Sequence, residues 1–119
     1  MKNYIAYFFI IFVLNGWAQK DLERAKHEFE HLNYVKAATL FEKCIKKGDY
    51  SKEVLQGAAD AHFFNTDMAN AVKWYGMLFS KYEESLDSEY IFRYVHALEG
   101  VGNYRLAKAL MKMYGNTDK

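Results

Sequence analysis

Asn33-Tyr34-Val35-Lys36-Ala37 is the first of three related segments; the others are Asp67-Met68-Ala69-Asn70-Ala71 and Asn103-Tyr104-Arg105-Leu106-Ala107. Each consists of Asn or Asp, a large apolar residue, two variable residues and Ala. The three alanines lie 34 and 36 residues apart. A large residue follows each alanine by four positions and an apolar or aromatic one by seven, which places all three side chains on one face of a helix. These pairs are Phe41 and Cys44, Tyr75 and Leu78, and Met111 and Tyr114.

A second stretch with helical periodicity precedes each segment. Its apolar residues recur at i, i+3 or i+4, and i+7, which predicts a helix with one apolar face. They are Leu22, Ala25, Phe29 and Leu32; then Leu55, Ala58, Ala59, His62 and Phe63; and finally Ile91, Tyr94, Val95 and Leu98. Residues that favour turns and helix N-caps separate the stretches at 33, 65–67 and 102–103, and at 47–49 and 85–88. The sequence therefore predicts an all-α fold of six helices in three helix-turn-helix units.

A helix-turn-helix period of 34 residues is typical of tetratricopeptide repeats. We therefore expect a tetratricopeptide-like solenoid whose repeats cover about residues 20–48, 50–83 and 87–115. The chain departs from the usual repeat because the small glycine of the first helix is Ala59 and then Val95, and because it contains no proline. No polar capping helix follows the apolar face of the last helix, so we expect a partner or further chain to cover that face.

The composition of the 119-residue chain excludes several classes of protein. With 51% hydrophobic and 26% charged residues, it is too apolar for a disordered chain and suits one domain with a single core. The net charge of +1 lacks the basic excess of a nucleic-acid-binding protein. Cys44 is the only cysteine, which excludes an internal disulfide and a cysteine-rich zinc site and favours a buried thiol. Charged runs such as residues 20–24 predict solvated helix faces with pairs such as Asp21 and Arg24.

The first 18 residues have the pattern of a secretory signal peptide. Lys2 supplies a positive charge, residues 4–14 form an apolar run of 11, and the small residues Gly16 and Ala18 precede the predicted cleavage site. Cleavage after Ala18 leaves one domain of 101 residues, 19–119. A transmembrane anchor is the alternative, but 11 apolar residues are fewer than the ~20 that span a membrane. We therefore expect an exported protein with no membrane span and no nucleic-acid partner.

The first helices of the three repeats are expected to line a concave surface that binds a protein or peptide partner. Aromatic residues among charged ones on this surface suit such recognition. Phe29 and Phe63 have packing between helices as an alternative role, whereas Phe64 and Phe92 are better candidates for exposed contacts. The repeat period places ten residues on or near the surface: Lys26, Phe29, Glu53, Gln56, Asp60, Phe63, Phe64, Phe92, His96 and Glu99.

The segment His27-Glu28-Phe29-Glu30-His31 matches the H-E-x-x-H motif, in which two histidines bind zinc and the glutamate activates water. On a helix both histidines lie about 160° from Phe29, which belongs to the core face, so they are expected to face solvent. No third ligand follows at a familiar spacing. We therefore predict no metal site, no cofactor and no catalytic residue, and keep a zinc peptidase only as an alternative.

Several segments together resemble the N-terminal tetratricopeptide region of OmpA-family cell-envelope proteins from Bacteroidetes. They are the Ala18-Gln19 junction, 29–37 (FEHLNYVKA), 73–79 (KWYGMLF) and 89–94 (EYIFRY), and the resemblance covers essentially all of residues 1–119. In that family the repeats precede a β-propeller-like segment and a C-terminal domain that binds peptidoglycan, and some members belong to secretion and gliding machinery. The resemblance implies a protein-interaction scaffold at the periplasmic face of the outer membrane, with partners in the envelope or in following domains of a longer chain. A free-standing periplasmic adaptor that binds a peptide is the alternative.

Overall fold

The computed structural model describes residues 19–115, and all regular structure within that range is helical. The α-helices are residues 19–30, α2 (Tyr34–Lys46), α3 (Lys52–Phe64), α4 (Met68–Tyr82), α5 (Ser88–Gly100) and α6 (Tyr104–Tyr114), with a short 3-10 helix, η1 (Glu83–Ser85), after α4. The prediction of an all-α fold with six helices is thus confirmed for this part of the chain. The predicted signal peptide, residues 1–18, lies outside the described residues.

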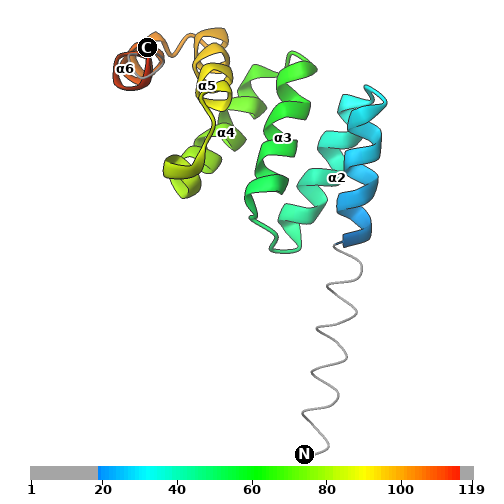
Figure 1. Ribbon diagram of the computed structural model, residues 1–119. Helices are drawn as coiled ribbons and strands as arrows, with labels where there is room; N and C mark the ends of the chain where they lie inside the picture. Colours follow the sequence, from blue (N-terminus) through cyan, green and yellow to red (C-terminus); the bar gives the residue numbers. More distant parts are fainter. Residues whose placement is uncertain (1–18, 116–119) are drawn as a thin grey trace, which may run out of the picture.

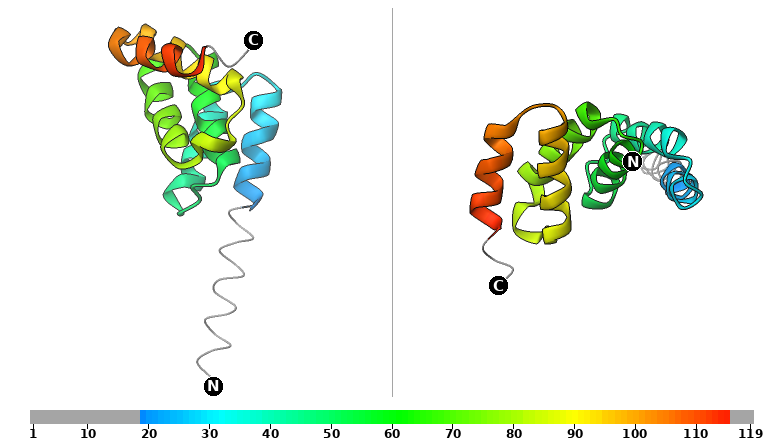
Figure 2. Two further views of the ribbon diagram at one scale, coloured as in Figure 1. Left: turned by 60° about the vertical axis from the view of Figure 1, so that its left-hand side comes forward. Right: turned by 90° about the horizontal axis from the view of Figure 1, so that it is seen from above.

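The helices follow one another along a curved row, with the helix over residues 19–30 and α6 at opposite ends (Figures 1 and 2). Extensive contacts join helices that are consecutive in the chain: α2 with α3, α3 with α4, α4 with α5 and α5 with α6. The helix over residues 19–30 packs on α2 and α3 through Phe29, whose ring contacts those of Tyr34 and Phe64. Packing of each unit mainly on its neighbours is typical of helical repeats.

The turn inside each helix pair has the same backbone conformation in all three units. Leu32, Thr66 and Gly102 each have a positive φ, of 63°, 62° and 81°. In each turn the N–H of the following Asn or Asp donates to the carbonyl five residues earlier, at 2.8–2.9 Å. A left-handed residue with this hydrogen bond ends one helix and directs the chain into the next. Because the three turns are 34 and 36 residues apart, the backbone repeats with the period of the sequence.

The two additional residues of the 36-residue interval fall within α4, which has 15 residues where α2 has 13. Ser51, the N-cap of α3, follows Ala37 by 14 residues, whereas Asp87, the N-cap of α5, follows Ala71 by 16. The connections between pairs, residues 47–51 and 83–87, are equally long, and the short helix η1 lies in the second. The segment that joins the pairs therefore keeps a constant length, and the second helix of the pair varies.

The core is built from small residues on the second helix of each pair and large residues one turn later. The alanines of the three related segments are buried, so each second helix can lie close to the first helix of its pair. Phe41 and Tyr75, four residues after their alanines, are buried as well. Met111, the equivalent residue of α6, is 39% exposed because no further helix covers it within residues 19–115.

Two sequence-based expectations about the first helix are wrong. Leu32, expected on the apolar face, is 70% exposed because the helix ends before it and it adopts the left-handed conformation of the turn. Asp21, expected on a solvated face beside Arg24, is buried and pairs with Lys47 at 2.5 Å and Lys43 at 3.9 Å. The hydrogen bond from Lys47 lowers the pKa of Asp21. These ion pairs join the start of the first helix to the end of α2.

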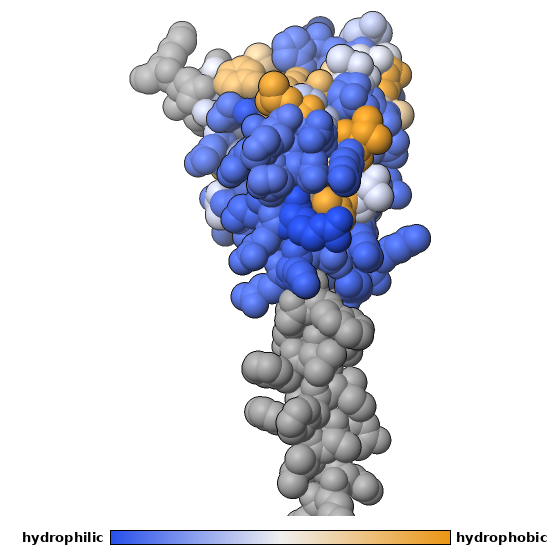
Figure 3. Space-filling model, turned by 90° about the vertical axis from the view of Figure 1, so that its right-hand side faces the viewer, coloured by the Kyte–Doolittle hydropathy of each residue, from blue (hydrophilic) through white to orange (hydrophobic). Residues whose placement is uncertain are grey.

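Both ends of the row expose some large hydrophobic side chains. The end formed by the helix over residues 19–30 and α2 is mostly hydrophilic, with a few scattered hydrophobic residues (Figure 3). At the other end, α6 buries Ala107 and Leu110 but exposes Tyr104, Met111 and Met113. Among the described residues, no helix combines the length and the hydropathy needed to cross a membrane.

Candidate functional site

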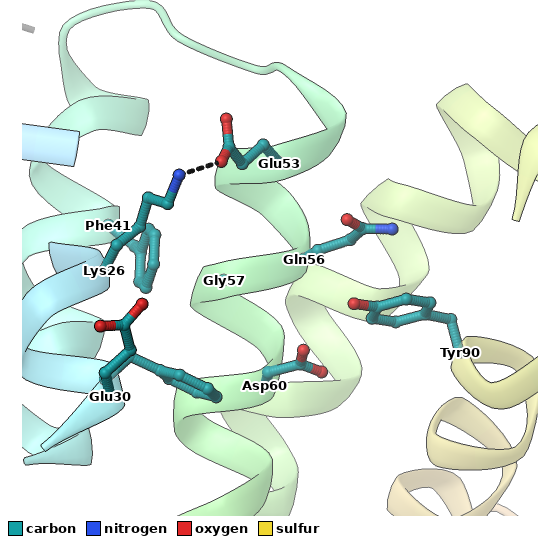
Figure 4. Close-up of a pocket in the computed structure, with 9 residues that line it drawn as sticks. Lys26, Glu30, Phe41, Glu53, Gln56, Gly57, Asp60 and Tyr90 are labelled. Carbon is teal, nitrogen blue, oxygen red and sulfur yellow. Dashed lines mark hydrogen bonds and ion pairs between the residues drawn. The ribbon is translucent and has the colours of Figure 1, made fainter. Parts of the chain in front are cut away.

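A groove of about 220 Å³ runs over α3, between the helix over residues 19–30 and α5 (Figure 4). Residues from three successive helix pairs meet there, because the curvature of the row brings the first helices of the pairs around one surface. The lining residues are Lys26, Phe29, Glu30, Phe41, Glu53, Gln56, Gly57, Asp60 and Tyr90.

The floor of the groove is formed by an aromatic ring under a glycine. Phe41 of α2 is buried, and a Cβ atom at position 57 would come within 2.3 Å of its ring. Gly57 therefore allows the ring to lie directly against α3, which no larger residue would permit without a shift. Phe29, partly buried on the first helix, makes an edge contact with Phe64 at a centroid distance of 6.0 Å. The groove is consequently apolar at its base.

An exposed ion pair crosses the rim of the groove. Lys26 Nζ donates to Glu53 Oε1 at 2.7 Å, which joins the first helix to α3. The hydrogen bond to Glu53 raises the pKa of Lys26. Glu30 lies one helical turn beyond Lys26 and lines the same groove, but it forms no ion pair within residues 19–115. The rim thus carries one ion-paired cation, Lys26, and one carboxylate, Glu30, without an ion pair of its own among the described residues.

Asp60 is a buried acid in the wall of the groove. Its Oδ1 accepts a hydrogen bond from the Tyr75 hydroxyl at 2.6 Å and lies 3.0 Å from Arg93 Nη1. Burial raises the pKa of Asp60, while the hydrogen bond from Tyr75 and the charge of Arg93 act in the opposite direction. The carboxylate thus connects side chains of α3, α4 and α5.

Arg93 connects this acid to aromatic side chains. Its guanidinium also donates to Glu89 at 2.5 Å and lies 5.1 Å from the ring centre of Phe64 and 5.3 Å from that of Tyr90. Two carboxylates therefore neutralise Arg93, and its cation stacks on rings that belong to the groove or lie next to it.

Half of the ten residues predicted from the repeat period line this groove: Lys26, Phe29, Glu53, Gln56 and Asp60. Phe63 packs against the core and contacts the rings of Phe64 and Tyr75. Phe64 is 42% exposed and adjoins the groove through Phe29 and Arg93.

The other three predicted residues are exposed on α5 and do not line the groove: Phe92, His96 and Glu99. Phe92 is 43% exposed. Glu99 belongs to a separate hollow of about 340 Å³ between α5 and α6, lined also by Val95, Tyr104, Ala107, Lys108 and Met111. Of these three residues only Glu99 lines the second hollow, and Phe92 and His96 line neither.

Four lining residues were missed by the sequence analysis: Glu30, Phe41, Gly57 and Tyr90. Phe41 belongs to a second helix and was assigned to the core, which it also forms. Gly57 gives the groove its depth because it has no side chain. It lies three residues before Asp60 and so on the same face of the helix, and this spacing could have indicated a depression on that face. Tyr90 reaches the groove only because of the curvature of the row, which the repeat period does not specify.

The H-E-x-x-H segment lies outside the groove apart from Phe29 and Glu30. His27 and His31 are both exposed, with ring centroids 4.2 Å apart, and His31 Nδ1 lies 2.8 Å from the carbonyl oxygen of His27. Across residues 19–115, no three His, Cys, Asp or Glu side chains are placed to share a metal ion.

The Cys44 thiol lies on the buried face of α2, and this burial raises its pKa.

Comparison of the chain with protein-family models, with curated proteins and with solved structures gave no match.

Proposed function

We propose that this chain is a tetratricopeptide-like scaffold that binds a segment of a partner polypeptide in the groove over α3. The observation that carries the proposal is the meeting of three successive helix pairs at one hollow with an aromatic floor and a charged rim. Curved helical repeats present extended binding surfaces of this kind. Aromatic side chains set among charged ones are typical of the residues that dominate protein recognition.

The tetratricopeptide-like character is supported by two independent periodicities. One is the spacing of Ala37, Ala71 and Ala107 in the sequence; the other is the recurrence of the same left-handed turn at equivalent positions. A helix pair of about 34 residues with a small residue at its contact is the unit from which such solenoids are built.

A binding role fits the chemistry of the groove better than a catalytic one. The acid in its wall, Asp60, is engaged by Tyr75 and Arg93, which hold the fold together. The thiol of Cys44 is buried with a raised pKa, so it is poorly suited to act as a nucleophile. The groove lining combines charge and aromatic surface without pairing a nucleophile to a base.

We further propose that the scaffold works in the cell envelope after export. The signal-peptide pattern of residues 1–18 and the resemblance to the N-terminal repeats of OmpA-family envelope proteins support this location. In this proposal the exposed apolar residues of α6, Tyr104 and Met111, are where a following domain or envelope partner packs, because their equivalents in earlier pairs are covered by the next helix.

Site-specific photocrosslinking tests the groove as the binding surface. A photoreactive amino acid replaces Gln56, which lines the groove, or Lys46, an exposed residue of α2 outside it. In cells of the source organism we expect a discrete crosslinked polypeptide from position 56 and none from position 46. Equal crosslinking from both positions, or crosslinking from 46 alone, would contradict the proposal.

The mass of the native protein in envelope fractions tests the cellular context. A mass several times that of the 14.0 kDa chain would assign these repeats to a larger envelope protein. A mass close to that of the 101 residues left after cleavage would indicate a free-standing adaptor, and the link to peptidoglycan would fail. Recovery from the cytosol alone would contradict export.

A further inference from the structure

We infer that the groove over α3 takes a polypeptide segment that carries a lysine or arginine side chain beside an apolar one. The inference rests on the proposed function and adds the charge and polarity of the ligand. Its basis is how the charged side chains around the groove are already paired.

The charged residues that line the groove are one cation and three carboxylates: Lys26, Glu30, Glu53 and Asp60. Lys26 is engaged by Glu53 at 2.7 Å, and Asp60 by Arg93 at 3.0 Å. Arg93 in turn also pairs with Glu89. Each cation at the groove thus already has at least one carboxylate, and the carboxylate of Glu30 is left over.

The position of Glu30 suits an incoming cation. It lies one turn from Lys26 on the same face of the first helix, near enough that its charge contributes to the raised pKa of Lys26, after the larger effect of Glu53. Its side chain is exposed at the rim, so a ligand can reach it without unfolding any contact. A cation placed there gains a charge-assisted hydrogen bond to the carboxylate of Glu30.

The rest of the groove suits an apolar neighbour of that cation. Phe41 and Phe29 supply the apolar surface, and Gly57 opens the way to the ring of Phe41. Aromatic faces also attract cations, and this fold already uses that contact where Arg93 lies over Phe64 and Lys73 lies 4.6 Å from the ring centre of Trp74. A basic side chain followed or preceded by an apolar one therefore finds both its partners in the groove.

An acidic segment is disfavoured by the same arrangement. An incoming Asp, Glu or C-terminal carboxylate would approach Glu30, Glu53 and Asp60 while the one lining cation, Lys26, is held by Glu53. Like charges at an interface act against the wrong partner and so contribute to specificity.

The test uses the purified full-length protein and a display library of random nonapeptides. We expect the bound pool to be enriched in Lys or Arg next to Phe, Leu, Ile or Met. A selected peptide is then synthesised in three forms, with Lys, norleucine or Glu at the basic position, and its affinity is measured by fluorescence anisotropy. We expect the lysine form to bind about threefold to fivefold more tightly than the norleucine form at low salt, as for an exposed ion pair. The glutamate form should bind most weakly.

Two substitutions on the first helix separate Glu30 from a general charge effect. Glu30→Gln should abolish the preference for lysine over norleucine. Glu23→Gln, an equal change of charge at an exposed position outside the groove, should preserve it. Enrichment of acidic peptides, or an unchanged lysine preference in Glu30→Gln, would overturn the inference.

A third variant distinguishes failure of the inference from failure of the proposed function. Gln56→Arg fills the groove at a half-buried position of α3. If peptides bind without charge preference and Gln56→Arg abolishes binding, the proposed function stands and the inference is wrong. If no peptide binds, or if binding is indifferent to Gln56→Arg, both are wrong. Circular dichroism of each variant verifies that its helices are retained.

Discussion

At the scale of single residues, Gly57 is the position where a minimal change has the most direct effect on the groove. An alanine there would place Cβ 2.3 Å from the buried ring of Phe41, so the ring or α3 must move. The cost of overpacking, ~1–3 kcal/mol, exceeds the gain of about 1 kcal/mol from replacing glycine in a helix. We expect Gly57→Ala to destabilise the protein by about 1 kcal/mol in urea unfolding.

Gly76→Ala is the matched control. Its Cβ would lie 3.3 Å from the hydroxyl of Tyr94 and would meet no other atom closer than 3.9 Å, so only a small adjustment is needed. Gly76→Ala should be neutral or stabilising by up to about 1 kcal/mol. If the two variants have the same unfolding midpoint, the close packing of Phe41 under α3 is not as described.

The ion pair between Asp21 and Lys47 predicts the response of stability to acid. The hydrogen bond from Lys47 lowers the pKa of Asp21 below that of an unfolded aspartate, about 3.9. Between those two pKa values the unfolded chain binds more protons than the folded one, so the free energy of unfolding falls as the pH falls through that window. Above about pH 5 the contribution is fully present.

We therefore expect Asp21→Asn to lose about 1–2 kcal/mol of stability at pH 7 and to depend less on pH as the pH falls below about 5. Asp87→Asn is the control, because Asp87 is exposed and its side chain caps no helix. Urea unfolding at a series of pH values measures both variants. An acid response of Asp21→Asn identical to that of the unaltered protein would disprove this role for Asp21.

At the scale of elements, the three turns inside the helix pairs form an internal comparison. The left-handed position is Gly102 in the last turn but Leu32 and Thr66 in the other two. A non-glycine residue in this conformation costs ~1–2 kcal/mol of stability. Glycine removes that strain, but the greater conformational entropy of its unfolded chain lowers the stability by about 0.5–1 kcal/mol.

Leu32→Gly should consequently stabilise the protein by about 0.5–1 kcal/mol, although it removes a large apolar side chain, because that side chain is 70% exposed. Gly102→Ala should destabilise it by about 1 kcal/mol. Both changes are read from the midpoint of urea unfolding at constant m-value. The free energy of unfolding should therefore change in opposite directions in the two variants. Destabilisation by Leu32→Gly would mean that the Leu32 side chain contributes more to stability than its exposure indicates.

The elements were predictable from sequence to the extent that the repeat period determines them. The period located the helices, their turns and the buried positions Ala37, Phe41, Ala71 and Tyr75, because each of these is set by spacing along one helix. It misplaced Leu32, where a left-handed turn replaces the last helical residue, and Asp21, whose partner Lys47 lies 26 residues away.

Only part of the candidate site could be predicted from the sequence, because the repeat period specifies the faces of the helices and not the way the helices pack together. Lys26, Glu53 and Gln56 follow from which helix face is concave. The depth of the groove depends on the missing side chain of Gly57 and on the bend that brings in Tyr90 from the third pair, which are tertiary properties.

At the scale of the whole molecule, packing mainly between consecutive helices predicts a gradient of local stability. α3 and α4 are covered on both sides along the row, whereas α6 contacts α5 and leaves Tyr104 and Met111 exposed. In such repeats, stability is approximately a sum over units and their nearest-neighbour interfaces. Native-state hydrogen exchange should therefore show the strongest protection in α3 and α4 and the weakest in α6. Equal protection in all helices would indicate a single cooperative unit instead.

Backbone amide NMR of the full chain, titrated with a selected lysine-containing peptide, can show whether a polypeptide binds in the groove over α3. We expect the amide shifts on titration to concentrate at Lys26, Glu30, Gly57, Asp60 and Tyr90, which belong to three different helices and come together only at the groove. Shifts confined instead to the hollow between α5 and α6, at Tyr104, Lys108 and Met111, or spread without pattern over the surface, would contradict it.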